Sequence, residues 1–393
     1  MVNREIYLNN AATAWPRAPG VTDAVAHVLS AIPDNPGRSE NISSCNPRYE
    51  RDLSGECRKH LAAMLAVPDE NRIVLCSNAT HALNLALLGQ SWKKGMRVIT
   101  SVTEHNSVLR PLAHLKKKNG FDLNSVGLDR NGALDTGAFD AALECNADLV
   151  VLNHASNVTG RIQDVRPLFA RAHEHGAVTL LDASQTLGHI PVHPESLGAD
   201  LVAFTGHKAL RGPPGTGGLY VSPAVELEQV FVGGTGVRSD LEFHPPEMPM
   251  RLEAGTPNLP AFAGLAAALR WHEEAGSIFQ EKEQAVARLL YDGLEGIDGV
   301  QIMDLDRQAG RVPIVSFRVS GWTVSDCGYA LANSFGIICR TGLHCAPLIH
   351  TAIGSAPDGT IRFSPSGCTS EEEIDAVLEA VKTLAGSRVL SGK

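Results

Sequence analysis

The distribution of apolar residues predicts a sheet that is buried on both faces. Five short runs are continuously apolar rather than alternating, as is typical of parallel strands covered by helices on both sides. These runs lie at residues 73–76, 98–100, 149–152, 178–181 and 201–204. Between them lie amphipathic segments with a helical repeat, at residues 80–88, 106–118 and 166–175. This alternation predicts right-handed crossovers and an α/β fold with a mainly parallel sheet.

The pattern changes after Gly255-Thr256-Pro257-Asn258, where a domain boundary is expected. A long helical stretch at about 261–294 leads into a shorter α/β region, which ends with a helical pattern. We therefore expect a large domain over residues 16–258 and a smaller C-terminal α/β domain over residues 259–393. The pattern alone does not assign residues 1–15, which we expect to pack with the smaller domain.

Composition and charge narrow the class of protein. The chain has 393 residues, 44% of them hydrophobic, and a net charge of -9, which argues against a general nucleic-acid binder. Eight cysteines show no C-x-x-C spacing, so we expect free thiols, no metal site and a reducing, cytoplasmic location. Neither a signal peptide nor an apolar stretch long enough to span a membrane is evident. These features predict a cytoplasmic enzyme.

Polar residues follow each of the predicted strands. Ligands of such sheets bind at the carboxyl ends of the strands, so these residues are candidates for a site. After the first run comes a helix start that offers N–H groups and hydroxyls to an anion, although an ordinary helix cap has the same pattern. Its residues are Ser77, Asn78, Ala79, Thr80 and His81. The other strands lead to His105, Asn157, Asp182, Gln185, Thr205, His207 and Lys208.

Together these residues indicate pyridoxal 5′-phosphate. That cofactor requires a Schiff-base lysine, an acidic partner for the pyridinium nitrogen and a phosphate site. Lys208 follows Asp182 by 26 residues, one strand–helix–strand unit, so both side chains can reach one ring. Dinucleotide binding is a weaker interpretation, because no G-x-G-x-x-G follows the first strand and no Walker A motif occurs. The glycine-rich segment 212–218 is more typical of a tight turn.

The order of these blocks resembles class V aminotransferase-like enzymes of fold type I. The similarity covers nearly the whole chain and is specific to the cysteine desulfurase/selenocysteine lyase family, including its SufS-like group. The matching blocks are Tyr7–Thr13, Ser77–Leu85, Glu104–Leu109, His154–Gly160, Asp182–Gln185 and Thr205–Lys208.

The resemblance implies roles around the cofactor. Lys208 would form the Schiff base, Asp182 would pair with the pyridine nitrogen and His105 would stack on the ring. The amides of Asn157 and Gln185 would flank the phenolic oxygen. The phosphate would be bound by Ala79, Thr80, His81, Thr205 and His207.

The resemblance also implies a homodimer with shared active sites. Gly233-Gly234-Thr235-Gly236 resembles the segment through which Thr235 of the second subunit reaches the phosphate. Arg362 matches the arginine that clamps the substrate α-carboxylate, for which a bidentate guanidinium is well suited. Asn10, Asn157 and Arg340 are further residues that we expect around the substrate.

The segment Arg340-Thr341-Gly342-Leu343-His344-Cys345-Ala346 resembles the Arg-x-Gly-His-His-Cys-Ala loop of the SufS-like enzymes. Cys345 would be the nucleophile, and the nearby arginine and histidine favour its reactive thiolate. Without the surrounding blocks, a buried structural cysteine would be the favoured interpretation. The other seven cysteines are better explained as core or incidental residues.

Several positions depart from the family pattern. Asn9 replaces an aspartate, and Leu343 replaces the first of two histidines, whose role is then lost or taken by His344. Glu40-Asn41 replaces Gly-His near the expected site entrance, and residues 366–369 lack the usual Asn-Thr ending. The departures leave open which amino acid is the substrate.

Three functions remain open at this point. The leading one converts L-cysteine to L-alanine with a persulfide on Cys345, or acts as a lyase on L-selenocysteine. The second is another class V reaction, transamination or β-elimination, with Cys345 as a bystander. The third is a non-catalytic scaffold or sulfur carrier that retains the cofactor. The expected partners are an amino-acid substrate, a second copy of the chain and a sulfur-acceptor protein.

Overall fold

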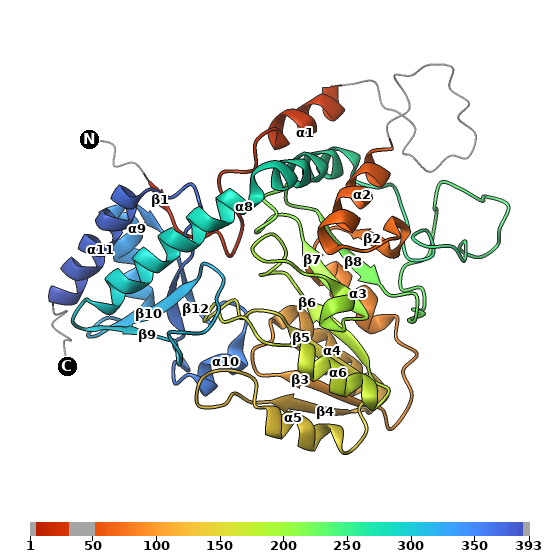
Figure 1. Ribbon diagram of the computed structural model, residues 1–393, viewed down its shortest axis with the longest axis horizontal. Coiled ribbons are helices and arrows are strands. Elements are labelled where there is room, and N and C mark those ends of the chain that lie inside the picture. The colour runs from red at the N-terminus through yellow and green to blue at the C-terminus, as the bar shows by residue number, and fades with distance from the viewer. Residues whose placement is uncertain (1–4, 31–51, 388–393) are drawn as a thin grey trace.

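A seven-stranded sheet forms the centre of the computed structural model, which describes residues 5–30 and 52–387 (Figure 1). Five adjacent strands, β7 to β4 in the sheet order, run parallel, and β8 is antiparallel to both its neighbours. The predicted mainly parallel sheet is confirmed. In sheet order the strands are β2 (Ile73–Cys76), β8 (Gly217–Val221), β7 (Leu201–Thr205), β6 (Val178–Asp182), β5 (Leu149–Asn153), β3 (Arg97–Ser101) and β4 (Asp122–Val126).

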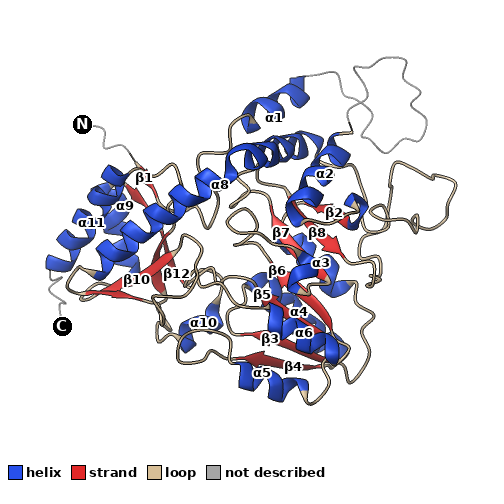
Figure 2. Ribbon diagram, in the orientation of Figure 1, coloured by secondary structure: helices blue, strands red, loops and turns tan. Residues whose placement is uncertain are grey.

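Helices cover both faces of this sheet, as the continuously apolar strands require (Figure 2). One face packs against α2 (Leu53–Leu65), α5 (Thr136–Leu143), α6 (Arg166–Glu174) and the start of α8. The other face packs against α3 (Ala79–Leu88) and α4 (Asn106–Asn119). The bounds of the predicted strands and helices agree with those in the structure to within one or two residues.

Two strands of the sheet were missing from the prediction. β4 is a largely exposed edge strand with a polar sequence, so it has no continuous apolar run. β8 begins with Gly217 and Gly218, where a Cβ atom would collide with Phe204 of β7. The backbone carbonyl of Phe204 thus explains Gly217, and the Phe204 ring explains Gly218, the two glycines that hid this strand.

A four-stranded antiparallel sheet forms a second core. Its order is β12 (Arg340–Gly342), β13 (Thr360–Phe363), β10 (Val315–Val319) and β9 (Val300–Ile302). It packs against α9 (Val324–Phe335) and α11 (Glu371–Gly386). Near the N-terminus, β1 (Ile6–Tyr7) pairs in parallel with β11 (Ile337–Ile338), and Ile6 and Leu8 lie in this second core.

The helix α8 (Leu259–Glu295) joins the two cores (Figure 1). Phe262 and Leu265 near its start pack under the seven-stranded sheet, whereas Leu290 and Leu294 near its end belong to the second core. α1 (Val21–Ser30) packs against the same helix. The boundary expected near residue 258 thus coincides with the start of an element that both cores share, and the domain limits stay a prediction.

Three shorter helices complete the fold, namely a 3-10 turn at Glu70–Arg72, α7 (Pro194–Leu197) and α10 (Pro347–Ala352). Within residues 5–30 and 52–387, no helix is long and apolar enough to cross a membrane. The same residues contain no group of three or more His, Cys, Asp or Glu side chains arranged to hold a metal ion.

Candidate active site

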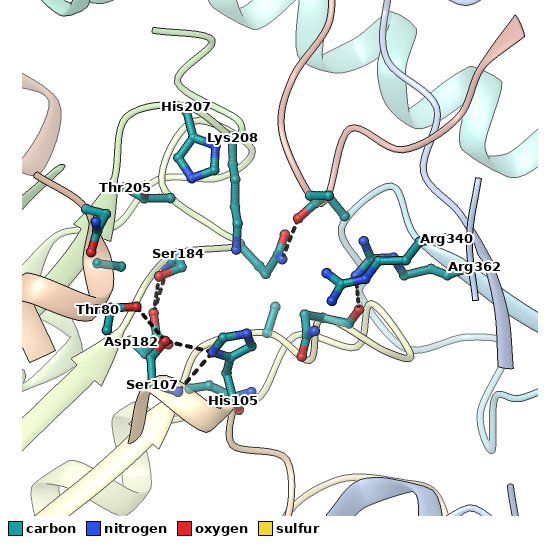
Figure 3. Close-up of a pocket in the computed structure, with 18 residues that line it drawn as sticks. Thr80, His105, Ser107, Asp182, Ser184, Thr205, His207, Lys208, Arg340 and Arg362 are labelled. Carbon is teal, nitrogen blue, oxygen red and sulfur yellow. Dashed lines mark hydrogen bonds between the residues drawn. The ribbon is translucent and has the colours of Figure 1, made fainter. Parts of the chain in front are cut away.

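A polar cavity of about 200 Å³ lies at the carboxyl ends of the central strands. Figure 3 shows its arrangement: hydroxyls and a helix start lie at one end, Arg340 and Arg362 lie at the other, and Lys208 reaches in between them. The cavity therefore has two regions that favour anions, separated by an amine.

The start of α3 forms the first of these regions. The side chain of Asn78 caps the helix by accepting a hydrogen bond from the backbone N–H of His81 at 2.9 Å. The N–H groups of Ala79 and Thr80 have no acceptor inside the helix and line the cavity. Thr205 lines it as well, and the Thr80 hydroxyl lies 2.8 Å from that of Ser107. These donors at a helix N-terminus suit a phosphate.

Two residues that were expected at the phosphate do not line this cavity. The ring of His81 lies 3.3 Å from the backbone nitrogen of Ser77 and packs edge-on against Phe231. It belongs to the wall of a larger neighbouring cavity of about 960 Å³. Thr235 donates to the carbonyl of Val237 at 2.8 Å. Both roles stay predictions.

Lys208 and Asp182 come from neighbouring strands. Asp182 ends β6, and its carboxylate accepts hydrogen bonds from the hydroxyl and backbone N–H of Ser184, the latter at 2.9 Å. Lys208 follows β7, and burial lowers the pKa of its amine to about 8, although the charge of Asp182 opposes this shift. A buried lysine with an uncharged fraction near neutral pH is suited to Schiff-base chemistry.

Two histidines at the cavity are held in the neutral form. His105 caps α4, and its Nδ1 lies 2.8 Å from the Ser107 hydroxyl. Burial, together with the charge of Lys208, lowers the pKa of His105 to about 4, and the same causes bring that of His207 to about 4. A neutral imidazole at the cavity wall is suited to stacking on an aromatic ring. Ser107 and Ser184 were not singled out in the sequence, where serines after a strand carry no distinctive signal.

Two amides lie between the ends of the cavity. Gln185 donates through Nε2 to the carbonyl of Ala11 at 3.1 Å, and Asn157 donates through Nδ2 to that of His344 at 2.7 Å. Each amide nitrogen retains a second hydrogen. The Oδ1 atom of Asn157 is buried and has no hydrogen-bond partner within the described parts of the chain. These groups are available to a polar ligand.

Two arginines form the second anion-binding region. Arg340 of β12 and Arg362 of β13 are register partners across the antiparallel pair. Arg362 is fully buried and donates to the Asn157 carbonyl at 2.8 Å and to Asn9 Oδ1 at 3.4 Å. Burial and the charge of Arg340 lower the pKa of Arg362 to about 9. Among the residues that the structure describes, neither arginine has a carboxylate partner, so this end is suited to a ligand carboxylate.

Cys345 lies beside these arginines on a strained turn. Nη2 of Arg340 donates to Sγ of Cys345 at 3.0 Å. His344 and Cys345 both adopt positive φ angles, 50° and 61°, which are unfavourable for residues with a Cβ atom. The turn is held from outside, because the carbonyl of Cys345 accepts from the backbone N–H of Asn106 at 2.7 Å. A partly exposed thiol is thereby fixed against a guanidinium.

The expectation that a histidine also assists Cys345 needs correction. His344 is 1% exposed, and its Nε2 lies 2.8 Å from the hydroxyl of Thr360. Burial lowers the pKa of His344 to about 2, so it carries no charge that could favour a thiolate. Leu343, which replaces the other histidine, is 38% exposed and has no proton to give. Arg340 is thus the group that polarises the thiol.

Asn10 also differs from its expected position. Its Oδ1 accepts from the backbone N–H of Trp15 at 2.9 Å, and its Nδ2 donates to the carbonyl of Ser364 at 2.9 Å. The neighbouring Ala11 and Ala12 line the cavity instead. These contacts favour a role in shaping the N-terminal segment rather than in binding substrate.

None of the cysteines that the structure describes lines the cavity itself, and Cys345 reaches its wall through the contact with Arg340. Cys57, Cys76 and Cys327 are buried, Cys339 is half-buried, and Cys145 and Cys368 are exposed. Cys45 and the Glu40-Asn41 departure lie outside the described residues. The Asn-Thr ending that residues 366–369 lack is replaced by a turn in which Ser366 N–H donates to Thr369 Oγ1 at 3.0 Å.

The cavity fits pyridoxal 5′-phosphate. Free N–H donors at the start of α3 suit its phosphate, Asp182 suits its ring nitrogen, and Lys208 suits its aldehyde. The buried, unsatisfied oxygen of Asn157 and the neutral ring of His105 indicate a polar, planar ligand between them.

Comparison with known proteins agrees with this geometry. The family model described as aminotransferase class-V matches residues 6–377. A probable cysteine desulfurase of Methanothermobacter thermautotrophicus is 32% identical over 98% of this chain and 96% of the relative. A cysteine desulfurase IscS of Escherichia coli O9:H4 is 30% identical over 97% of this chain and 93% of the relative.

Solved structures are similar over the same extent. The apo structure of a cysteine desulfurase from Thermococcus onnurineus NA1 has a TM-score of 0.88 and 31% identity, covering 97% of this chain and 95% of that chain. The cysteine desulfurase CsdA of Escherichia coli has a TM-score of 0.84 and 27% identity, covering 96% and 94%. The chain therefore belongs to the pyridoxal-phosphate-dependent class V aminotransferase family, within its cysteine desulfurase group.

Proposed function

We propose that this protein is a cysteine desulfurase that converts L-cysteine to L-alanine and retains the sulfur as a persulfide on Cys345. The observation that carries the proposal is the contact between Cys345 and Arg340, whose side chain lines the Lys208 cavity and lies 3.0 Å from Sγ of Cys345. The names of the curated relatives and solved structures, which are cysteine desulfurases, support the same activity.

The residues of the site divide the reaction between them. Arg362 binds the substrate carboxylate with a guanidinium that has no competing carboxylate among the described residues. The bound cofactor supplies an electron sink for the carbanion at the substrate Cα. Lys208 in its uncharged form removes the Cα proton, a role that its lowered pKa supports.

Sulfur transfer follows at Cys345. Its thiolate forms a bond to the substrate sulfur, and the bond between that sulfur and Cβ breaks. The electron pair left on Cβ takes up one proton, and Lys208 returns the other to Cα to give alanine. Arg340 stabilises the thiolate before the attack. These reaction steps require a thiol within reach of the substrate sulfur, whereas transamination requires no such thiol.

We further infer a homodimer that operates in the cytoplasm and hands its sulfur to an acceptor protein. An apolar segment near Thr235 favours a second copy, because Phe231, Val232 and Phe243 are 50%, 73% and 77% exposed. All seven cysteines within residues 5–30 and 52–387 are free, which favours a reducing compartment.

Substitution of Cys345 by serine tests the proposed function. Serine keeps the size of the side chain but is a far poorer nucleophile toward sulfur, so persulfide and alanine formation from L-cysteine should fall about a hundredfold or more. The cofactor absorbance should still change when L-cysteine binds. The assay measures alanine, pyruvate, sulfide and selenide with L-cysteine and L-selenocysteine.

Two variants serve as controls for this experiment. Cys368 is also next to an arginine, with its Sγ 3.7 Å from Arg211, so Cys368→Ser should keep full activity. Lys208→Ala should abolish every product. Alanine formation by Cys345→Ser at the wild-type rate would exclude the desulfurase, and pyruvate or a keto acid as the main product would indicate elimination or transamination.

A further inference from the structure

The end of β3 carries a buried carboxyl group that the proposed reaction does not use. Glu104 is 0% exposed and directly precedes His105. Its Oε1 accepts hydrogen bonds from the Ser101 hydroxyl at 2.7 Å and from the backbone N–H of Asn153 at 2.9 Å. Its Oε2 has no hydrogen-bond partner within the part of the chain that the structure describes. This carboxyl group therefore links the end of β3 to the end of β5.

A small network of side chains rigidifies the same link. The Thr103 hydroxyl donates to Asn153 Oδ1 at 2.7 Å, and Asn153 Nδ2 donates back to the Thr103 carbonyl at 2.7 Å. The hydroxyls of Ser101 and Thr103 lie 2.6 Å apart. Every atom in this network is buried, so its geometry is set by the network itself rather than by solvent.

The network lies next to two groups that hold the cofactor. Asn153 is the register partner of Asp182 on the neighbouring strand. His105, the residue after Glu104, begins α4 and lines the cavity. A change at Glu104 would thus displace His105, because the two residues are adjacent in the chain. It would also displace Asp182, because Asn153 and Asp182 are paired across β5 and β6.

The surroundings of Glu104 favour its uncharged form. Within residues 5–30 and 52–387, no lysine, arginine or histidine forms an ion pair with it. Burial, aided by the charge of Asp182, raises the pKa of Glu104 to about 8. A buried carboxyl group without a cationic partner favours the protonated form. The proton then belongs on Oε2, the oxygen that accepts no hydrogen bond.

We propose that Glu104 is a positioning residue which, as an uncharged carboxylic acid, holds His105 and Asp182 in the geometry that binds the cofactor ring. Oε1 acts as the carbonyl oxygen that joins β3 to β5. The absence of charge on Glu104 would leave Asp182 as the acidic partner of the ring nitrogen. The inference rests on the cofactor role of Asp182 but not on the desulfurase reaction.

Infrared spectroscopy of the holoenzyme tests the protonation state directly. Only a protonated carboxyl group shows the C=O stretch of a carboxylic acid. The infrared difference spectrum, wild type minus Glu104→Gln, should therefore contain that band at neutral pH. Its absence would overturn the proposal. The measurement needs no substrate, so it remains informative even if the enzyme proves to catalyse another reaction.

A series of substitutions tests the positioning role. Glutamine retains an uncharged carbonyl oxygen, so Glu104→Gln should keep the cofactor absorbance spectrum and the cofactor Kd within about twofold of wild type. Glu104→Ala leaves the buried N–H of Asn153 without an acceptor, and the cofactor Kd should rise about tenfold. Equal losses in the Gln and Ala variants would show that a negative charge is required, and an unchanged Kd in Glu104→Ala would show that Glu104 positions nothing.

Two further variants guard against a trivial outcome. Ser101→Ala removes only one donor to Oε1, so it should raise the cofactor Kd severalfold even if Glu104→Ala does not fold. Glu253 is a matched control, because it is a buried carboxylate paired with Arg58 at 2.8 Å. Glu253→Gln should lower Tm, whereas Glu104→Gln should not. If Glu104→Gln lowered Tm as much as Glu253→Gln does, Glu104 would be charged in the folded protein.

Discussion

Replacing Arg362 by methionine separates the cost of a buried charge from its use in binding substrate. Methionine fills a similar volume without a charge. Arg362 is fully buried, and its pKa is lowered from 12.5 to about 9, chiefly by burial. The unfolded chain therefore holds this proton better than the folded protein does. A cation with a lowered pKa destabilises the fold at every pH below the folded value, and the penalty is relieved as the pH rises from about 9 toward 12.5.

The size of the effect follows from the shift. At about 1.4 kcal/mol per pKa unit, the charged guanidinium costs the folded state on the order of 5 kcal/mol. Loss of its hydrogen bond to the buried Asn157 carbonyl offsets about 1–3 kcal/mol of that cost. Arg362→Met should therefore stabilise the substrate-free protein by about 2–4 kcal/mol and raise its Tm by several degrees.

Substrate binding should respond in the opposite direction. Loss of one partner of a desolvated charge pair costs about 2–5 kcal/mol, so the KM for L-cysteine should rise roughly 30-fold to several thousand-fold. The cofactor spectrum should be unchanged, because Arg362 lies at the far end of the cavity from the phosphate site (Figure 3). Steady-state kinetics and thermal melting of the same preparation measure both effects.

Arg58 is the matched control for this experiment. It is also a buried arginine, but it is paired with both oxygens of Glu253 at 2.8 Å. Arg58→Met breaks a buried ion pair and should cost about 3–5 kcal/mol of stability with no change in KM. If Arg362→Met behaved like Arg58→Met, losing stability while keeping KM within twofold, Arg362 would be a structural cation and another group would bind the carboxylate.

Two further predictions concern the thiol and the response to acid. Arg340→Gln removes the hydrogen bond to Sγ of Cys345, so alkylation of Cys345 by iodoacetamide at pH 7 should slow about tenfold. Alkylation of Cys368 in the same sample serves as the reference. Equal alkylation rates of Cys345 in wild type and variant would contradict a role for Arg340 in activating the thiol. Burial lowers the pKa of His154 from 6.5 to about 4, so the unfolded chain takes up the proton first and stability falls as the pH drops from about 6.5 to 4. Between pH 7 and 5 the wild type should lose about 2 kcal/mol more than His154→Gln in urea unfolding, and identical losses would refute this.

Local pattern determined the secondary structure and the chemical class of the site. Strands such as β5 and β7 are buried on both faces, so each is apolar at its first four positions and is evident without knowledge of its neighbours. Lys208 and Asp182 were evident for a similar reason, since each follows a strand, and the carboxyl ends of parallel strands meet at one edge. Strand β8 was not evident, because its two glycines are required by the backbone and the ring of Phe204 on the neighbouring strand β7.

Tertiary structure alone decided which side chains meet and which are charged. Arg340 and Arg362 face each other because of the register between β12 and β13, and no local pattern contains that register. His344 and Glu104 are ordinary titratable residues in the sequence, but burial makes the first a neutral histidine and the second a neutral acid. Burial and register depend on segments far apart in the chain. The sequence by itself therefore identified the groups of this site, and packing determined their protonation and their partners.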